Sequence, residues 1–189
     1  MRLVLLSEKG AMMMGVGCAA RAHCGARGIG AMASLVGLVQ MTSTNDIEAN
    51  LAACAASVAH AKAQGCALVL FPECFAMLGA KKGETQAAAE ELDGPLLGRY
   101  RALAKEHGLW LSLGGFPERG PRWADDQHIF NTHVVVTAAG EISAVYRKIH
   151  LFDVPSLGLV ESRQALPGDV GAEPYVVACD SPAARLGLR

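Results

Sequence analysis

A continuous apolar run, Cys66–Phe71, most constrains what this chain can fold into. It follows a segment, 45–65, in which apolar residues recur at helical spacing, and Pro72 comes directly after it. A short strand that is apolar at every position is typical of a sheet covered on both faces. Proline cannot donate to a central ladder, so the strand is predicted to end there. The pattern predicts a strand inside a layered α/β domain.

The residues before this run predict a strand and a helix. Ser34–Val39 is short, apolar and followed by polar turn residues. Asn45 is predicted to start the helix, with Glu48 three residues later as its capping-box partner, and Gly65 to stop it. The predicted buried stripe of the helix consists of Ile47, Leu51, Cys54, Ala55 and Val58.

The residues after this run predict a loop with a short helix at its end over 76–92, and then further elements. These are a helix Pro95–Gly108, a strand Leu109–Leu113 running into Gly114-Gly115, a hairpin of Ile129–Thr137 and Ile142–Tyr146, and short strands Tyr175–Ala178 and Leu186–Leu188. The order β-α-β-α-β-β-β predicts an α/β domain with a mixed sheet.

Composition excludes several classes of protein. The 189 residues suit one domain with a sizeable core, because 51% are hydrophobic and 19% charged. The net charge of −1, with no basic patch, argues against nucleic acid as a partner. No apolar run reaches the roughly 18 residues of a membrane span. The six cysteines form no Cys-x-x-Cys pair, so they predict buried free thiols rather than a metal site.

The first 33 residues differ from the rest. They are basic and acid-poor, with Glu8 as the only acid. Two interpretations stay open: a targeting-like extension, or disordered or untranslated sequence upstream of a start at Met32. Under both, we expect the folded domain to span 34–189.

Two charged residues stand where predicted strands end. Glu73 follows Phe71-Pro72, and Lys148 follows the strand that ends at Tyr146. Ligands of open α/β sheets bind at the carboxyl ends of the strands. A carboxylate there loses hydration, which suits a general base, and an ammonium in the same crevice could stabilise an oxyanion. Either residue alone could equally be a surface charge, so the hypothesis depends on their joint placement.

Other candidates are weaker. His128 and His133 are expected to pack rather than to bind a metal. Asn131, polar within an apolar strand, is expected to satisfy a neighbouring polar group. Gly114-Gly115 lacks the G-x-G-x-x-G spacing of a dinucleotide site, and no phosphate-loop motif is present.

Several motifs occur together in one order. They are Gly37-Leu38-Val39-Gln40-Met41, Leu70-Phe71-Pro72-Glu73, Gly108–Phe116, Asn131–Val134 and Tyr146–Leu151. Through them the chain, over 34–189, resembles the nitrilase superfamily of carbon–nitrogen hydrolases. Within this superfamily it is similar to the amidase branch that cleaves deaminated glutathione.

The resemblance implies an α-β-β-α sandwich that forms a homodimer, acts on a small carboxylate-bearing amide and needs no metal or organic cofactor. The scattered cysteines predict a reducing compartment, so we expect a cytoplasmic protein, with the mitochondrion as the alternative if the basic N-terminus is a targeting segment. The family's catalytic glutamate falls on Glu73 as general base, and its lysine falls on Lys148 for oxyanion stabilisation. In the family mechanism a cysteine thiolate attacks the amide carbon, ammonia leaves, and water releases the acid.

The sequence departs from the family pattern in two places. The family's nucleophile follows a strand of the type L-G-L-x-x-C, whereas here Leu186-Gly187-Leu188 is followed only by Arg189. The family's second glutamate is expected to be lost through a short deletion near Asp153–Ser156, and Glu161 is not given its role. Cys74 is expected to point away from Glu73 on an extended stretch, and Cys179 to lie on a turn.

We therefore expect a sandwich that is incomplete at the C-terminus, with no nucleophilic cysteine in residues 1–189. We also expect no turnover and low solubility for these residues alone, because a sheet face and edge would be uncovered. Two alternatives stay open: a non-catalytic dimerising subunit of the same fold, and an unrelated α/β small-molecule binder.

Overall fold

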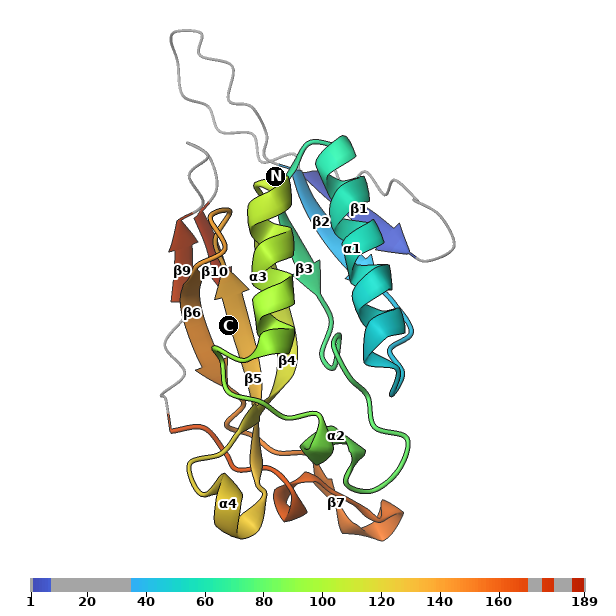
Figure 1. The fold of residues 1–189 in the computed structure, drawn as a ribbon, viewed down its shortest axis with the longest axis vertical. Helices are drawn as coiled ribbons and strands as arrows, with labels where there is room; N and C mark the ends of the chain where they lie inside the picture. The colour runs from blue at the N-terminus through green and yellow to red at the C-terminus, as the bar shows by residue number, and fades with distance from the viewer. Residues whose placement is uncertain (1, 8–34, 170–174, 179–184, 189) are drawn as a thin grey trace, which may run out of the picture.

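The chain forms a six-stranded mixed sheet with two long helices on one face (Figure 1). The computed structural model describes residues 2–7, 35–169, 175–178 and 185–188. The strands are β1 (Arg2–Ser7), β2 (Leu35–Gln40), β3 (Cys66–Phe71), β4 (Trp110–Arg119), β5 (Ile129–Val136), β6 (Ile142–Arg147), β7 (Asp153–Val154), β8 (Leu159–Val160), β9 (Tyr175–Ala178) and β10 (Arg185–Leu188). The helices are α1 (Ile47–Ala63), α2 (Glu84–Ala87), α3 (Pro95–His107), α4 (Trp123–Asp126), and the 3-10 turns η1 (Pro155–Leu157) and η2 (Glu161–Arg163).

The strand order of the main sheet is β1-β2-β3-β4-β5-β6. The first four strands run parallel, β5 is antiparallel to β4, and β6 is antiparallel to β5. Two reversals bring β6 back to the direction of β3. The carboxyl ends of β3 and β6 therefore face the same edge of the sheet, although Phe71 and Arg147, which end these strands, lie far apart in the sequence.

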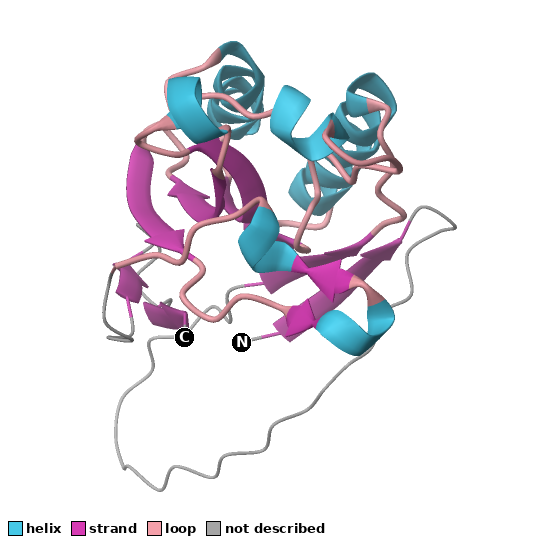
Figure 2. Cartoon of the chain, turned by 90° about the horizontal axis from the view of Figure 1, so that it is seen from below, coloured by secondary structure: helices cyan, strands magenta, loops and turns pink. Residues whose placement is uncertain are grey.

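The core lies between the sheet and the helices α1 and α3, which pack beside each other above it (Figure 2). Side chains alternate across each strand. Val69 and Leu111 point into this core, while their neighbours Leu68 and Trp110 join a smaller cluster on the opposite face. Both faces of the sheet therefore carry apolar side chains, as the continuous apolar run of β3 predicts.

The N-terminal residues differ from the prediction. Residues 2–7, which the sequence assigned to an extension outside the domain, form β1 and pair in parallel with β2. Leu6 is buried in the main core, so the prediction of disorder is wrong for these residues. An apolar segment gains both ladder hydrogen bonds and burial at the edge of β2. Residues 8–34 lie outside the described part of the chain, so the targeting interpretation stays a prediction.

Two element boundaries also differ from the prediction. The cap of α1 is Asp46 rather than Asn45: its carboxylate accepts the Ala49 N–H at 3.0 Å, while Glu48 turns outward to Arg99. Strand β4 extends through Gly114-Gly115 to Arg119, because a bulge there lets it resume pairing with β5.

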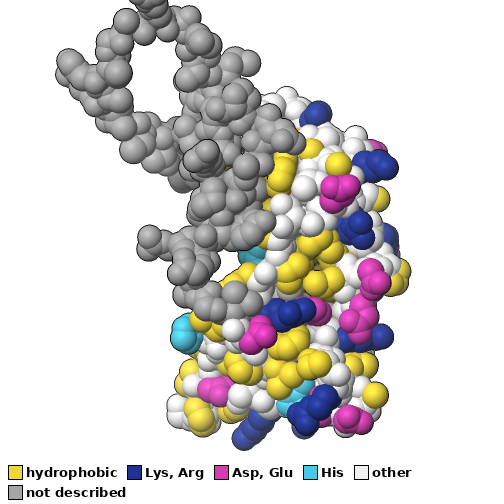
Figure 3. All heavy atoms as spheres, turned by 90° about the vertical axis from the view of Figure 1, so that its left-hand side faces the viewer, with side chains coloured by type: hydrophobic (Ala, Val, Ile, Leu, Met, Phe, Trp, Pro, Cys, Tyr) yellow, Lys and Arg dark blue, Asp and Glu magenta, His cyan; other side chains and the backbone are white. Residues whose placement is uncertain are grey.

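The predicted helix limits at Pro95 and Gly108 are confirmed, and the predicted hairpin forms β5 and β6. Two-stranded antiparallel pairs are formed by β7 with β8 and by β9 with β10, and β9 contacts β6. Hydrophobic side chains gather on the side of the molecule that β6 borders (Figure 3), and Val145 and Tyr146 of this strand are exposed. No helix among the described residues is long and apolar enough to cross a bilayer.

Candidate active site

Glu73 projects from the turn that follows β3. Pro72 ends the strand, and Cys74, with φ of 59°, turns the chain sharply after the glutamate. The Glu73 side chain is 57% exposed, so its carboxylate reaches solvent. This places an accessible carboxylate at the sheet edge where β3 and β6 both end.

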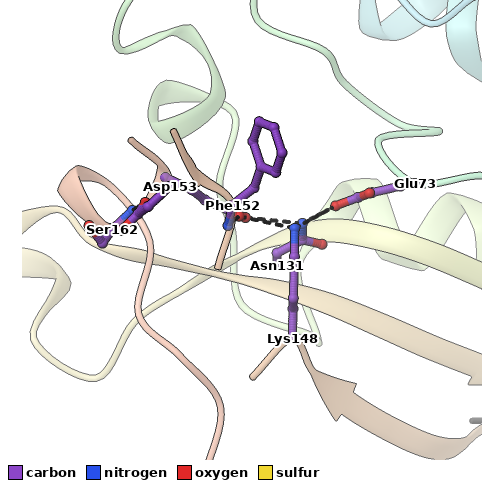
Figure 4. A network of polar contacts seen from close by, with 7 residues as sticks. Glu73, Asn131, Lys148, Phe152, Asp153 and Ser162 are labelled. Carbon is purple, nitrogen blue, oxygen red and sulfur yellow. Dashed lines mark hydrogen bonds and ion pairs between the residues drawn. The ribbon is translucent and has the colours of Figure 1, made fainter. Parts of the chain in front are cut away.

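Lys148 occupies the matching position after β6. Its backbone N–H donates to the Asn131 carbonyl and its own carbonyl accepts from the Gly168 N–H, each at 2.9 Å. The Lys148 ammonium lies 3.4 Å from Glu73 Oε1 (Figure 4). The structure thus brings together the two residues that the sequence placed at strand ends.

Glu161 joins them, although its position along the chain suggested no role at this site. Its Oε2 lies 3.0 Å from Lys148 Nζ and accepts the Phe152 N–H at 2.6 Å. The short β7–β8 hairpin folds the chain back, so that a residue thirteen positions after Lys148 returns to it. The structure therefore places a second carboxylate beside Lys148, at a position to which the sequence did not assign the family's second glutamate. Spacing alone could not reveal this, because the hairpin sets the distance.

Asn131 of β5 completes the cluster. Its Nδ2 donates to Glu73 Oε1 at 2.5 Å and lies 3.5 Å from Glu161 Oε1. The prediction that this asparagine satisfies a neighbouring polar group is confirmed. The neighbours are the two carboxylates, and Figure 4 shows the Asn131 side chain beside Lys148 and Glu73. We call Glu73, Asn131, Lys148 and Glu161 the carboxylate–lysine cluster.

The electrostatics of the cluster keep its lysine charged. Partial burial lowers the pKa of Lys148, but the hydrogen bond to Glu161 and the charges of Glu73 and Glu161 outweigh it. The net pKa lies above its ordinary value, so the amine is an ammonium at neutral pH. The ammonium can stabilise a negatively charged oxygen of a substrate. A carboxylate beside it can accept a proton.

Cys74 does not resemble an activated nucleophile. It is not on an extended stretch, as the sequence predicted, since its backbone lies in the left-handed region. Burial first, and then the charges of Glu73 and Glu161, raise the pKa of its thiol despite the opposing effect of Lys148. A thiol with a raised pKa supplies little thiolate at neutral pH. Cys179 lies outside the described residues.

The two histidines that the sequence singled out contact neighbouring polar side chains. His133 Nε2 lies 2.8 Å from Ser112 Oγ, and burial lowers the pKa of His133. His128 Nδ1 lies 3.3 Å from Asp126. The described residues contain no group of three or more His, Cys, Asp or Glu side chains arranged to hold a metal ion.

Comparison with known proteins supplies a family context for this geometry. The family model described as carbon-nitrogen hydrolase matches residues 35–188. The deaminated glutathione amidase of Rattus norvegicus is 43% identical over 157 residues, which are 82% of this chain and 47% of that protein. This chain therefore spans about half the length of that relative.

Solved structures share the fold. The crystal structure of the C. elegans NitFhit protein superposes with a TM-score of 0.68 at 36% identity, covering 81% of this chain and 36% of that one. A variant of the Nesterenkonia AN1 amidase, from the nitrilase superfamily, gives a TM-score of 0.60 at 25% identity over 76% of this chain and 51% of the other. The expected α/β nitrilase fold is confirmed.

Proposed function

Because this chain belongs to the carbon–nitrogen hydrolase family, we propose that its protein hydrolyses a small carboxylate-bearing amide such as deaminated glutathione. The observation that carries the proposal is the contact of the Lys148 ammonium with the carboxylates of Glu73 and Glu161. A base and a cation at one strand-end edge are what amide hydrolysis through a thiol requires. The similarity to deaminated glutathione amidases supports the choice of substrate.

In the proposed reaction Glu73 is the general base and Lys148 stabilises the oxyanion. Glu73 takes the thiol proton of a cysteine, and the thiolate attacks the amide carbon. Lys148 stabilises the negative oxygen of the tetrahedral intermediate. The C–N bond then breaks as Glu73 returns its proton to the leaving nitrogen, which departs as ammonia.

Water completes the cycle. It gives a proton to Glu73 as its oxygen attacks the thioester, the carboxylic acid leaves, and the thiol is regenerated. Glu161 keeps Lys148 charged and in place between the two carboxylates. Its hydrogen bond from the Phe152 N–H holds the loop after Lys148 close to this site.

The nucleophile is assigned by resemblance to a cysteine that follows the strand ending at Leu188. We therefore propose that residues 1–189 by themselves give no turnover. The proposed homodimer also rests on the resemblance, whereas the proposed cytoplasmic location, with the mitochondrion as the alternative, rests on the cysteine usage and the basic N-terminus.

The test is Glu73→Gln in the protein extended through the cysteine-bearing strand, assayed for ammonia release from deaminated glutathione. Loss of the base should lower kcat about 10²- to 10⁴-fold. Glu106→Gln, an exposed glutamate on α3, is the matched control and should keep the activity of the unmodified protein. Turnover in Glu73→Gln equal to that of the control would remove the base role. No turnover in the unmodified protein would favour a non-catalytic subunit.

A further inference from the structure

Asn131 occupies a central place in the carboxylate–lysine cluster. It lies on β5 opposite Pro117 of β4, and its carbonyl accepts the Lys148 N–H on the other side. Its side chain is half-buried and reaches the strand-end edge where Glu73 stands. One residue therefore contacts both the lysine, through its backbone, and the glutamate, through its amide.

The cluster is a closed ring of two donors and two acceptors. The Asn131 amide donates to Glu73 Oε1 at 2.5 Å and approaches Glu161 Oε1 at 3.5 Å. The Lys148 ammonium lies 3.4 Å from Glu73 Oε1 and 3.0 Å from Glu161 Oε2. Each carboxylate thus lies beside both the neutral amide and the charged ammonium, and Glu161 also accepts the Phe152 N–H.

This arrangement distinguishes the two oxygens of Glu73. Oε1 is held by Asn131 and Lys148, whereas Oε2 makes no hydrogen bond to any of the described residues. A carboxylate anchored through one oxygen presents the other in a fixed direction. An anchored base loses less orientational freedom during proton transfer than a freely rotating one.

The bulge in β4 makes room for this contact. At Gly115, where φ is +66°, a Cβ would lie 2.6 Å from Glu73 Cγ and 3.0 Å from Asn131 Oδ1. At Gly114 a Cβ would lie 3.0 Å from the Phe71 carbonyl oxygen. The Gly114-Gly115 pair, which lacks a dinucleotide-binding spacing, instead lets the end of β3 and the side chain of Asn131 approach each other.

We infer that Asn131 is a positioning residue that anchors Glu73 through Oε1 and leaves Oε2 as its proton-accepting oxygen, in the space opened by Gly114-Gly115. The inference rests on the proposed function for its catalytic meaning. The anchoring contact itself can be tested without turnover.

The first experiment follows the Asn131 side-chain amide by NMR in the extended protein labelled with ¹⁵N. A short bond to a carboxylate shifts the donating amide proton downfield. Glu73→Gln should move this resonance upfield, and Glu106→Gln should leave it in place. An unshifted Asn131 resonance in Glu73→Gln would overturn the anchoring contact.

The second experiment measures kinetics in the extended protein. Asn131→Ala should lower kcat about 10- to 100-fold, the scale expected from a misplaced catalytic group, with KM within about threefold of its original value. Asn131→Asp replaces the donor by a third carboxylate. Adjacent carboxylates repel each other, so one of them holds a proton up to a higher pH. As pH falls, kcat/KM of this variant should therefore decline at a pH about one unit higher than in the unmodified protein.

The control is Asn45→Ala, which removes an exposed asparagine whose side chain, among the described residues, hydrogen-bonds to Glu84 and not to the carboxylate–lysine cluster. If Glu73→Gln abolishes turnover while both Asn131 variants keep the original kcat and pH profile, the positioning role is wrong and the proposed function stands. If Glu73→Gln leaves turnover intact, the proposed function fails instead. Should Asn131→Ala unfold, Asn131→Ser, which keeps a donor, provides the kcat measurement, with a smaller loss expected than in Asn131→Asp.

Discussion

Replacing Arg147 by methionine tests how strongly buried Glu118 depends on its ion pair. Glu118 is only 5% exposed. It accepts from Arg147 Nη2 at 2.5 Å, from Arg147 Nε at 2.7 Å and from Thr132 Oγ1 at 2.7 Å. The variant would leave a buried carboxylate with one neutral donor, which is the situation in which breaking an ion pair is most destabilising.

The magnitude follows from the burial of the two partners. Removing one partner of a buried pair costs about 3–5 kcal/mol. Arg147 is 33% exposed and borders a cavity of about 650 Å³ through which water can reach the carboxylate. We therefore expect the lower end, about 3 kcal/mol, which corresponds to roughly 6–12 °C in Tm for a domain of this size.

Urea unfolding followed by tryptophan fluorescence measures this loss, because Trp110 lies in the sheet and Trp123 borders the same cavity. The matched control is Arg99→Met. Arg99 also binds a glutamate, Glu48, at 2.5 Å, but the two side chains are 46% and 72% exposed, so solvent screens the pair and the loss of stability should be much smaller than in Arg147→Met. If Arg147→Met loses no more free energy of unfolding than Arg99→Met, the reasoning from burial is refuted.

Two further predictions concern stability. Burial lowers the pKa of His133 below its ordinary 6.5, so the unfolded state binds a proton at a higher pH than the folded state does. The free energy of unfolding should therefore fall as pH drops below about 6.5. Urea midpoints at several pH values measure this fall, and an equally steep fall in His133→Gln would contradict the assignment to His133. Asp46→Ala should lower the free energy of unfolding by about 1 kcal/mol because it removes the α1 cap, and Asn45→Ala should lower it by less. The reverse order of urea midpoints would show that Asn45 caps the helix.

The elements of the fold could be predicted from local patterns. The apolar run of β3, the proline at the start of α3 and the glycine at its end each act within a few residues, so their positions agree with the structure. Boundaries set by competition between neighbours were predicted less well. Asp46 rather than Asn45 caps α1, and the β4 strand continues past its glycines because β5 offers further pairing.

In the candidate site, too, the sequence identifies single residues, but the topology decides whether they meet. Glu73 and Lys148 could be named from the sequence, because each directly follows a strand and strand ends are local features. Their meeting depends on the topology, since only the two reversals at β5 and β6 return the chain to the edge where β3 ends.

Glu161 and Asn131 enter the cluster only in three dimensions. The β7–β8 hairpin returns Glu161 to Lys148, and the β4 bulge lets Asn131 reach Glu73. Residue types and periodicity specify which segments become strands and which charges stand at their ends. Hydrogen-bond distances between segments far apart in the chain depend on how those strands pair, and pairing is a property of the folded molecule as a whole.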